Sequence, residues 1–215
     1  MIKGIIFDLD GTLLNSLEDL QIATNYVLVN NGCKTISLEQ TKAFVGNGNA
    51  KLLARAFSCF NKPYQDSYLD MFKDYYNKHL TDNTIPYDDI MELVKSLKNN
   101  NIKMAICSNK YQQAVNIVCK PFFENIIDYF IGASDKIRTK PDLDMINLAL
   151  ESMNIKSNEC LYVGDSDVDF ITAKKANIKF VFVSWGFKKI DEDTIDYSID
   201  KPNQLLDIIK ENEDD

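Results

Sequence analysis

The hydrophobic positions along the chain form short continuous runs separated by longer amphipathic stretches. Runs typical of buried parallel strands lie at 2–7, 104–107, 160–163 and 180–183, with a weaker one at 129–131. Between them, apolar residues recur at helical spacing, as in 90–97 and 146–150. Strands that alternate with helices indicate right-handed crossovers. The pattern therefore predicts an α/β fold with a doubly wound, mostly parallel, Rossmann-like sheet.

Residues 16–83 interrupt this alternation, because they carry helical signals and no convincing strand. Ser37 and Gln40 have the spacing of a capping box. A set of aromatic residues at helical spacing favours packing in a core over a ligand surface: Tyr68, Phe72, Tyr75 and Tyr76. We expect a helical insertion over 16–83, placed after the first strand of a core that comprises 1–15 and 84–215.

Residues able to do chemistry gather after the predicted strands. In an open parallel sheet, ligands bind beyond the carboxyl ends of the strands, so these residues are expected at one edge of the sheet. They are Asp8, Asp10, Ser108, Asn109, Asp165 and Asp169, and Lys140 joins them ahead of the predicted helix that contains Ile146. Taken singly, Asp165 or Ser166 is explained equally well as a helix cap, Lys140 as a solvated loop charge and Ser108 as a turn residue. Their coincidence at strand ends favours a shared site.

The first pair of acids indicates a metal. Asp8 and Asp10 follow the apolar run Ile5-Ile6-Phe7 and are one residue apart, so an extended chain places them on one face. Like charges so placed repel unless a cation or a shared proton relieves them. A divalent cation is the simplest partner for such a pair.

The composition narrows the classes of partner and location. The formal net charge is −8 and the pI is near 4.8, and there is no basic stripe, which argues against a nucleic-acid partner. No apolar run has the length needed to cross a bilayer, so we expect no membrane association. The five cysteines are scattered without a C-x-x-C pair, which is typical of free thiols in the cytoplasm. The sequence leaves a monomer and a homodimer equally open.

Four segments, taken in order, resemble the motifs of the haloacid dehalogenase superfamily. They are Asp8-Leu9-Asp10-Gly11-Thr12, Ser108 after the second core strand, Lys140-Pro141, and Gly164-Asp165-Ser166 with Asp169. The resemblance covers nearly the whole chain and implies that 16–83 is a helical cap. Within the family, 44–48, 107–110 and 183–187 are similar to bacterial phosphoglycolate phosphatases. Ser108 stands where threonine is usual there, a second proline after Lys140 is missing, and Asn177 replaces a glycine.

The resemblance implies a phosphoryl-transfer mechanism on the two acids of the first motif. Asp8 is expected to be the nucleophile that forms an aspartyl-phosphate, and Asp10 the general acid and then base. Asp8, the backbone carbonyl of Asp10 and the carboxylate of Asp165 are expected to bind Mg²⁺. Asp169 is expected to orient metal-bound waters or the lysine from a second layer.

The remaining motif residues are expected to hold the phosphate. Ser108 and the backbone N–H of Asn109 supply donors, and Lys140 offsets the charge shared by Asp8 and the phosphate. The implied partner is a small phosphate ester, most simply 2-phosphoglycolate. A nucleotide or pyrophosphate phosphatase, a hexose-phosphate mutase of the same superfamily and a catalytically silent phosphate-binding module are the alternatives. The presence of Asp10 and Asp165 argues against a haloacid dehalogenase proper.

The loop Gly46-Asn47-Gly48 is the candidate for reading the rest of the substrate. Its two glycines permit close approach of the backbone to a ligand, and a helix is predicted to begin at about Ala50, whose N-terminus favours an anion. Lys42 or Arg55 adds positive charge if it points inward. We therefore expect this loop to bind the non-phosphate end of the substrate, although a plain turn between two helices has the same pattern.

Overall fold

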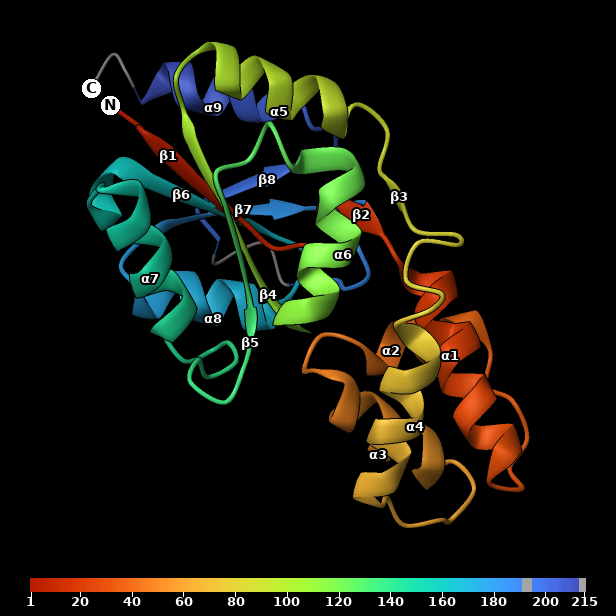
Figure 1. Cartoon of the computed structure of the whole chain (residues 1–215). Coiled ribbons are helices and arrows are strands. Elements are labelled where there is room, and N and C mark those ends of the chain that lie inside the picture. The colour runs from red at the N-terminus through yellow and green to blue at the C-terminus, as the bar shows by residue number, and fades with distance from the viewer. Residues whose placement is uncertain (191–194, 213–215) are drawn as a thin grey trace.

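The computed structural model describes residues 1–190 and 195–212, and its centre is a six-stranded sheet (Figure 1). The strand order is β5-β4-β1-β6-β7-β8, and every neighbouring pair is parallel. The strands are β1 (Gly4–Phe7), β4 (Lys103–Tyr111), β5 (Tyr129–Ala133), β6 (Cys160–Gly164), β7 (Lys179–Val183) and β8 (Tyr197–Ile199). The predicted doubly wound α/β fold is confirmed.

Helices cover both faces of the sheet, because alternate strand residues point to opposite sides. Ile5 and Phe7 of β1 belong to one buried cluster, together with residues of three helices: α5 (Ile90–Asn99), α6 (Gln112–Phe123) and α9 (Gln204–Glu211). Ile6 belongs to the cluster on the other face, with α7 (Asp144–Met153) and α8 (Asp167–Lys175). Burial on both faces explains why the strands read as continuous apolar runs.

The strand order places a topological switch point beside β1. From β1 the chain reaches β4 and β5 on one side of the sheet, and it then crosses to β6, β7 and β8 on the other. The connections leave the carboxyl ends of β1, β4 and β6 in opposite directions, so a crevice forms there. Residues that follow these three strands therefore meet at one point.

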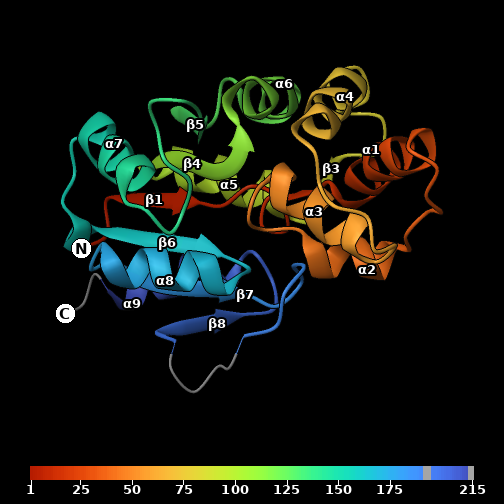
Figure 2. The ribbon, with the colours of Figure 1, turned by 90° about the horizontal axis from the view of Figure 1, so that it is seen from below.

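A separate group of helices follows β1: α1 (Leu17–Asn30), α2 (Leu38–Phe44), α3 (Asn49–Ser58) and α4 (Asp66–Tyr76). We call them the cap helices, and the division of the chain at 16–83 stays our proposal. They pack against one another, and Figure 2 shows β1 and β6 running toward them. A two-stranded antiparallel pair joins the ends of this group to the core: β2 (Leu14–Asn15) and β3 (Ile85–Pro86).

A buried acid on α1 ties the two connections together. Asp19, only 2% exposed, accepts hydrogen bonds from the backbone N–H and side-chain amide of Asn83 and from the Thr84 hydroxyl, at 2.7–3.1 Å. Charge-assisted bonds of this kind satisfy a carboxylate that has no cation beside it. The segment that enters the cap helices and the one that leaves them are thus fixed to each other.

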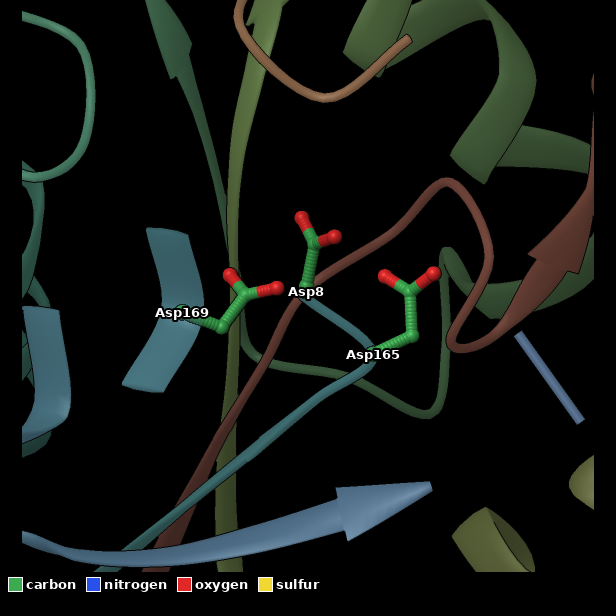
Figure 3. A group of neighbouring side chains, drawn as sticks. All are labelled: Asp8, Asp165 and Asp169. Atoms are coloured by element: carbon green, nitrogen blue, oxygen red, sulfur yellow. The ribbon is translucent and has the colours of Figure 1, made fainter. Parts of the chain in front are cut away.

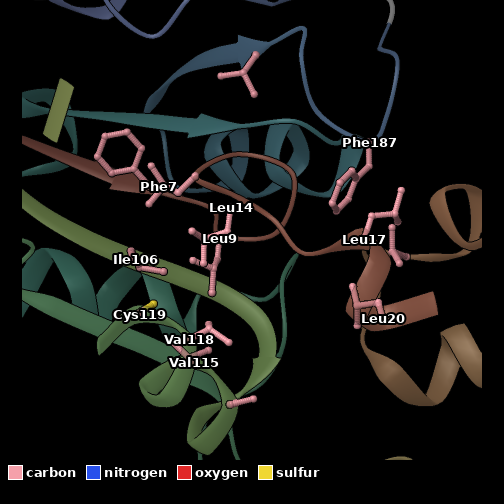
Figure 4. Packing of buried hydrophobic residues seen from close by; sticks show 14 of the residues in the cluster. Phe7, Leu9, Leu14, Leu17, Leu20, Ile106, Val115, Val118, Cys119 and Phe187 are labelled. Carbon is pink, nitrogen blue, oxygen red and sulfur yellow. The ribbon is translucent and has the colours of Figure 1, made fainter. Parts of the chain in front are cut away.

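The apolar core runs without interruption from the sheet to the cap helices. Figure 4 shows the side chains of Phe7 and Ile106 in the same cluster as Leu17 and Leu20 at the start of α1, with Phe187 beside them. Burial of this surface contributes about 25 cal/mol per Å². Among residues 1–190 and 195–212, no helix combines the length and the apolar character needed to cross a bilayer.

The differences from the sequence prediction are local. β4 continues to Tyr111, four residues further than expected, past a register shift between Ser108 and Tyr111. β2, β3 and β8 are two or three residues long, too short for an apolar pattern to reveal. α3 begins at Asn49, one residue before the predicted start, and its buried aromatic residue is Phe57. The capping box of α2 is confirmed, because Ser37 and Gln40 bond reciprocally. Of the aromatic set, Tyr68, Phe72 and Tyr76 are buried in the core, and Tyr75 is partly buried against it.

Candidate active site

Three buried carboxylates meet at the switch point (Figure 3). Asp8 directly follows β1, Asp165 directly follows β6, and Asp169 lies in the first turn of α8. One carboxylate oxygen from each lies within 4.8 Å of the others. The carboxyl ends of neighbouring parallel strands thus bring together residues that are about 160 positions apart in the chain.

Close packing of the backbone holds these acids in place. Gly11 has a φ of +96°, and a Cβ atom there would lie 2.5 Å from Oδ2 of Asp165. Only glycine therefore lets the loop after β1 turn against this carboxylate. The same oxygen accepts a hydrogen bond of 2.6 Å from the backbone N–H of Phe187. The Asp165 carboxylate is fixed from two sides before any ligand binds.

The acids are short of positive charge. Burial and the Asp169 carboxylate raise the pKa of Asp8 to about 7, against the opposing effect of Lys140. Burial, Asp169 and Asp8 raise the pKa of Asp165 well above its usual range. Burial and neighbouring like charges both favour the protonated form. A divalent cation among these oxygens would reverse both shifts.

Lys140 is the ammonium group between two of these acids. Its Nζ lies 2.7 Å from Oδ1 of Asp8 and 2.7 Å from Oδ1 of Asp169, and its side chain is 3% exposed. Burial alone would lower the pKa of Lys140, but the carboxylates of Asp169 and Asp8 raise it well above the usual value. The lysine is therefore charged at neutral pH.

Asp169 is engaged by donors on every side. Besides Lys140, its oxygens accept hydrogen bonds from the hydroxyl of Tyr162 at 3.0 Å and from the hydroxyl of Ser166 at 2.5 Å. Ser166 also caps α8 by accepting from the N–H of Asp169. These bonds orient Asp169 toward the lysine, although its distance from Asp8 and Asp165 also suits a metal ligand.

Ser108 and Asn109 lie in the irregular end of β4, opposite Lys140. Ser108 is 2% exposed and lines the cavity in front of Asp8. The side-chain oxygen of Asn109 accepts from the N–H of Lys140 at 2.7 Å, and its amide donates to the carbonyl oxygens of Lys140 and Gly46 at 3.2 Å. Asn109 thus connects the lysine segment with the loop between α2 and α3.

Asp10 is separate from the three clustered acids. Its carboxylate accepts a hydrogen bond of 2.5 Å from the hydroxyl of Ser16 and lies 3.0 Å, through both oxygens, from Nζ of Lys110. Lys110 also donates to the hydroxyl of Tyr76 at 2.9 Å. In the sequence, Lys110 stands beside Ser108 and Asn109, but no spacing rule pairs it with Asp10. The sequence pattern therefore did not reveal this ion pair.

A small cavity of about 50 Å³ lies in front of Asp8, and its core side includes Asp10, Ser108, Lys110 and Lys140. Val45, Gly46, Gly48 and Leu52 form its cap side. The side chain of Asn47 is not part of the cavity lining. Its side-chain oxygen accepts from Arg55, which also donates to the carbonyl of Phe44. Arg55 thus shapes the loop, and Lys42 is exposed at the surface.

The donor set suits a hard divalent cation. The carboxylates of Asp8, Asp165 and Asp169 offer oxygen ligands only, as Mg²⁺ requires. Together with Asp10 the site has four acids, against the two ammonium groups of Lys110 and Lys140. It therefore carries two uncompensated negative charges when all of these groups are ionised. The residues present therefore fit the magnesium ion that the sequence implied.

Comparisons with known proteins identify relatives of this chain. A family model described as haloacid dehalogenase-like hydrolase matches residues 5–183. A phosphoglycolate phosphatase of Pseudomonas syringae pv. tomato is 31% identical over 86% of this chain and 70% of its own length. A protein of Caldanaerobacter subterraneus subsp. tengcongensis, assigned as a pyrophosphatase, is 29% identical over 97% of this chain and 95% of its own. A crystal structure from Lactobacillus delbrueckii subsp. bulgaricus, assigned as a phosphoglycolate phosphatase, has a TM-score of 0.89 at 28% identity and covers 96% of this chain and 98% of that one.

Proposed function

The chain belongs to the haloacid dehalogenase-like hydrolases, and we propose that it is a Mg²⁺-dependent phosphatase that acts on a small phosphate ester. The observation that carries the proposal is the placement of Asp8. Its carboxylate lies at the cavity, 2.7 Å from the ammonium group of Lys140 and beside Ser108. A nucleophile, a cation and a hydroxyl donor around one small space are what phosphoryl transfer requires.

In the first step a carboxylate oxygen of Asp8 attacks phosphorus, and the bond from phosphorus to the ester oxygen breaks. Asp10 gives its proton to the leaving alkoxide. In the second step Asp10 takes a proton from water, which attacks phosphorus, releases inorganic phosphate and restores Asp8. Ser108, the N–H of Asn109 and Lys140 bind the phosphate oxygens throughout.

The carboxylates of Asp8 and Asp165, with the backbone carbonyl of Asp10, would hold Mg²⁺. The ion supplies positive charge against which the phosphate oxygens are stabilised. Asp169 then serves to orient Lys140, in keeping with its bonds to Lys140, Tyr162 and Ser166. The cytoplasmic location and the choice between monomer and homodimer stay predictions.

For the substrate we propose 2-phosphoglycolate. The small cavity favours an ester with few atoms beyond the phosphate, and several relatives that match most of this chain are named phosphoglycolate phosphatases. Inorganic pyrophosphate is the second candidate, because a relative assigned as a pyrophosphatase matches nearly the full chain. Both candidates carry only a small group beside the phosphate that is transferred, as the small cavity requires.

A phosphate-release screen tests this proposal. The purified chain with Mg²⁺ is assayed on 2-phosphoglycolate, pyrophosphate, nucleoside monophosphates and sugar phosphates, and hexose-phosphate isomerisation is followed separately. We expect 2-phosphoglycolate to have the highest kcat/KM, and EDTA to abolish turnover until Mg²⁺ is restored. Asp8→Asn should lose activity on every substrate. Activity in this variant at a tenth of the parental rate would remove Asp8 as the nucleophile.

We propose further that the loop at Gly46-Asn47-Gly48 reads the end of the substrate remote from phosphate. Gly46 and Gly48 line the cavity, and Gly48 has a φ of +86°. In Gly48→Val, strain at that φ distorts the loop. We expect KM for 2-phosphoglycolate to rise much more than KM for an aryl phosphate. Equal changes for both substrates would mean that the loop is only scaffolding.

A further inference from the structure

A buried lysine connects the proton-transfer acid with the cap helices. The side chain of Lys110 is 2% exposed, and its ammonium group has three hydrogen-bond donors. Its Nζ lies 3.0 Å from both Oδ1 and Oδ2 of Asp10, and it donates to the hydroxyl of Tyr76 at 2.9 Å. The ammonium group is therefore held between the Asp10 carboxylate and the Tyr76 hydroxyl.

Tyr76 belongs to the cap helices, whereas Lys110 belongs to the sheet. It is the last residue of α4, it is fully buried, and the rest of α4 packs on α1 and α3. The next residue, Asn77, accepts a hydrogen bond of 2.7 Å from the hydroxyl of Tyr111 at the end of β4. The end of α4 is therefore docked on the end of β4 through two adjacent polar contacts. Lys110 is the partner of Tyr76 in the first of these contacts.

Lys110 in turn sets the orientation of Asp10. Asp10 lies in the loop after β1. Its side chain is 20% exposed, against 11% for Asp8. Contact of the ammonium group with both oxygens, together with the Ser16 hydroxyl on Oδ1, restrains the direction in which the carboxylate points. A proton donor must face the leaving oxygen within hydrogen-bond reach, and a small misplacement costs a large factor in rate.

We propose that Tyr76 and Lys110 are positioning residues for Asp10, so that a cap helix sets the orientation of the proton-transfer acid. This inference rests on the proposed function of Asp10 as proton donor. The phenol oxygen holds the ammonium group, and the ammonium group holds the carboxylate toward the cavity, which both Asp10 and Lys110 line. The role is distinct from packing, because the Tyr76 ring is already enclosed by apolar neighbours such as Phe72.

The matched test is Tyr76→Phe against Tyr68→Phe. The first variant removes only the hydroxyl and keeps the ring, over which Nζ of Lys110 lies 5.0 Å from the centroid. Tyr68 lies on the same helix and is 4% exposed, and within the described residues its hydroxyl has no hydrogen-bond partner. Each variant is assayed for kcat/KM on an alkyl phosphate, 2-phosphoglycolate, and on an aryl phosphate, p-nitrophenyl phosphate.

The two substrates differ in their need for a proton donor. An alkoxide is a poor leaving group, whereas p-nitrophenolate departs without protonation. We expect Tyr76→Phe to lower kcat/KM for 2-phosphoglycolate by about tenfold or more, the effect of misplacing a general acid, while the aryl phosphate changes little. Tyr68→Phe should leave both values near the parental ones. Lys110→Met, as a second variant, should show the same selective loss to a larger extent.

Equal losses on both substrates in Tyr76→Phe, or no loss on either, would overturn the inference. Asp10→Asn in the same assay separates this failure from a failure of the proposed function. A selective loss in Asp10→Asn without one in Tyr76→Phe refutes only the positioning role. No selective loss in Asp10→Asn refutes the proton-donor role itself. Near-ultraviolet circular dichroism of each variant verifies that it is folded before its kinetics are compared.

Discussion

Replacement of Lys140 by methionine should destabilise the metal-free protein in a pH-dependent way. The substitution keeps a long apolar side chain but removes the ammonium group that lies 2.7 Å from both Asp8 and Asp169, whose side chains are 11% and 0% exposed. Loss of one partner from a buried ion pair leaves an uncompensated charge, which costs about 3–5 kcal/mol of unfolding free energy.

In the variant, a buried carboxylate can take up a proton instead of staying charged, at a free-energy cost that depends on pH. Holding a carboxyl protonated costs about 1.4 kcal/mol for each pH unit above its ordinary pKa of 3.8. Near pH 8 that is about 6 kcal/mol, more than the cost of the bare charge, so the full loss of about 3–5 kcal/mol is expected. Near pH 5 it is only about 2 kcal/mol, so protonation limits the loss to that value.

The sign follows from proton linkage. The pKa of Asp8 is raised to about 7 in the folded protein, so between about pH 4 and pH 7 the folded state binds more protons than the unfolded state. Stability of the metal-free protein therefore falls as the pH rises through this window. Removal of Lys140 raises the affinity of the folded state for protons further, so the fall continues to higher pH.

Urea unfolding in EDTA, near pH 5 and near pH 8, measures the effect. Fluorescence of Trp185 reports it, because this is the only tryptophan and its indole N–H donates to the carbonyl of Thr12 at 3.0 Å beside the site. Lys3→Met is the control. Its pair with Glu159 is 54% and 23% exposed, and its loss should cost less than about 1 kcal/mol. Equal destabilisation of Lys140→Met at both pH values, or less than about 1 kcal/mol near pH 8, would refute the reasoning.

Three further outcomes are expected. Asp19→Ala should lower the free energy of unfolding by about 3 kcal/mol, because buried donors lose their acceptor, and the exposed neighbour change Glu18→Ala should have almost no effect in the same urea titration. Mg²⁺ affinity, measured by calorimetry, should increase as the pH rises through about 7, with proton release below that pH, since the ion displaces the proton of Asp8; a constant affinity would contradict this. Ser108→Ala should raise the inhibition constant of inorganic phosphate by about tenfold, and an unchanged constant would remove Ser108 from the phosphate site.

The sequence was sufficient to place the site residues that directly follow buried strands. Asp8 and Asp165 could be placed together because each directly follows a buried run, and parallel strands bring such positions to one edge of the sheet. Lys140 follows no strand. Its place ahead of a predicted helix made it a candidate, the family resemblance gave it a role, and the structure brings it to the same acids. β8 escaped prediction because three residues on the far side of β7 carry no recognisable pattern.

Contacts between distant polar residues could not be read from the chain. Lys110 and Asp10 are 100 positions apart, and only the docking of α4 on β4 brings the hydroxyl of Tyr76 to the lysine. Tyr76 has the spacing of a packed aromatic residue, which it also is, so nothing in the pattern distinguishes its hydroxyl from that of Tyr68. Asp19 likewise resembles a solvent-facing helix acid until the fold places Asn83 and Thr84 against it.

The covalent step on Asp8 is the central claim, and a rapid acid quench tests it most directly. The protein with Mg²⁺ is mixed with 2-phosphoglycolate that carries a radioactive phosphate, stopped within one turnover, digested, and examined by mass spectrometry. We predict a phosphate label on the peptide that contains Asp8, stable to acid and released by hydroxylamine, as an acyl-phosphate requires. Phosphate release at the normal rate with no label on the chain, or with the label on another residue, would contradict the account.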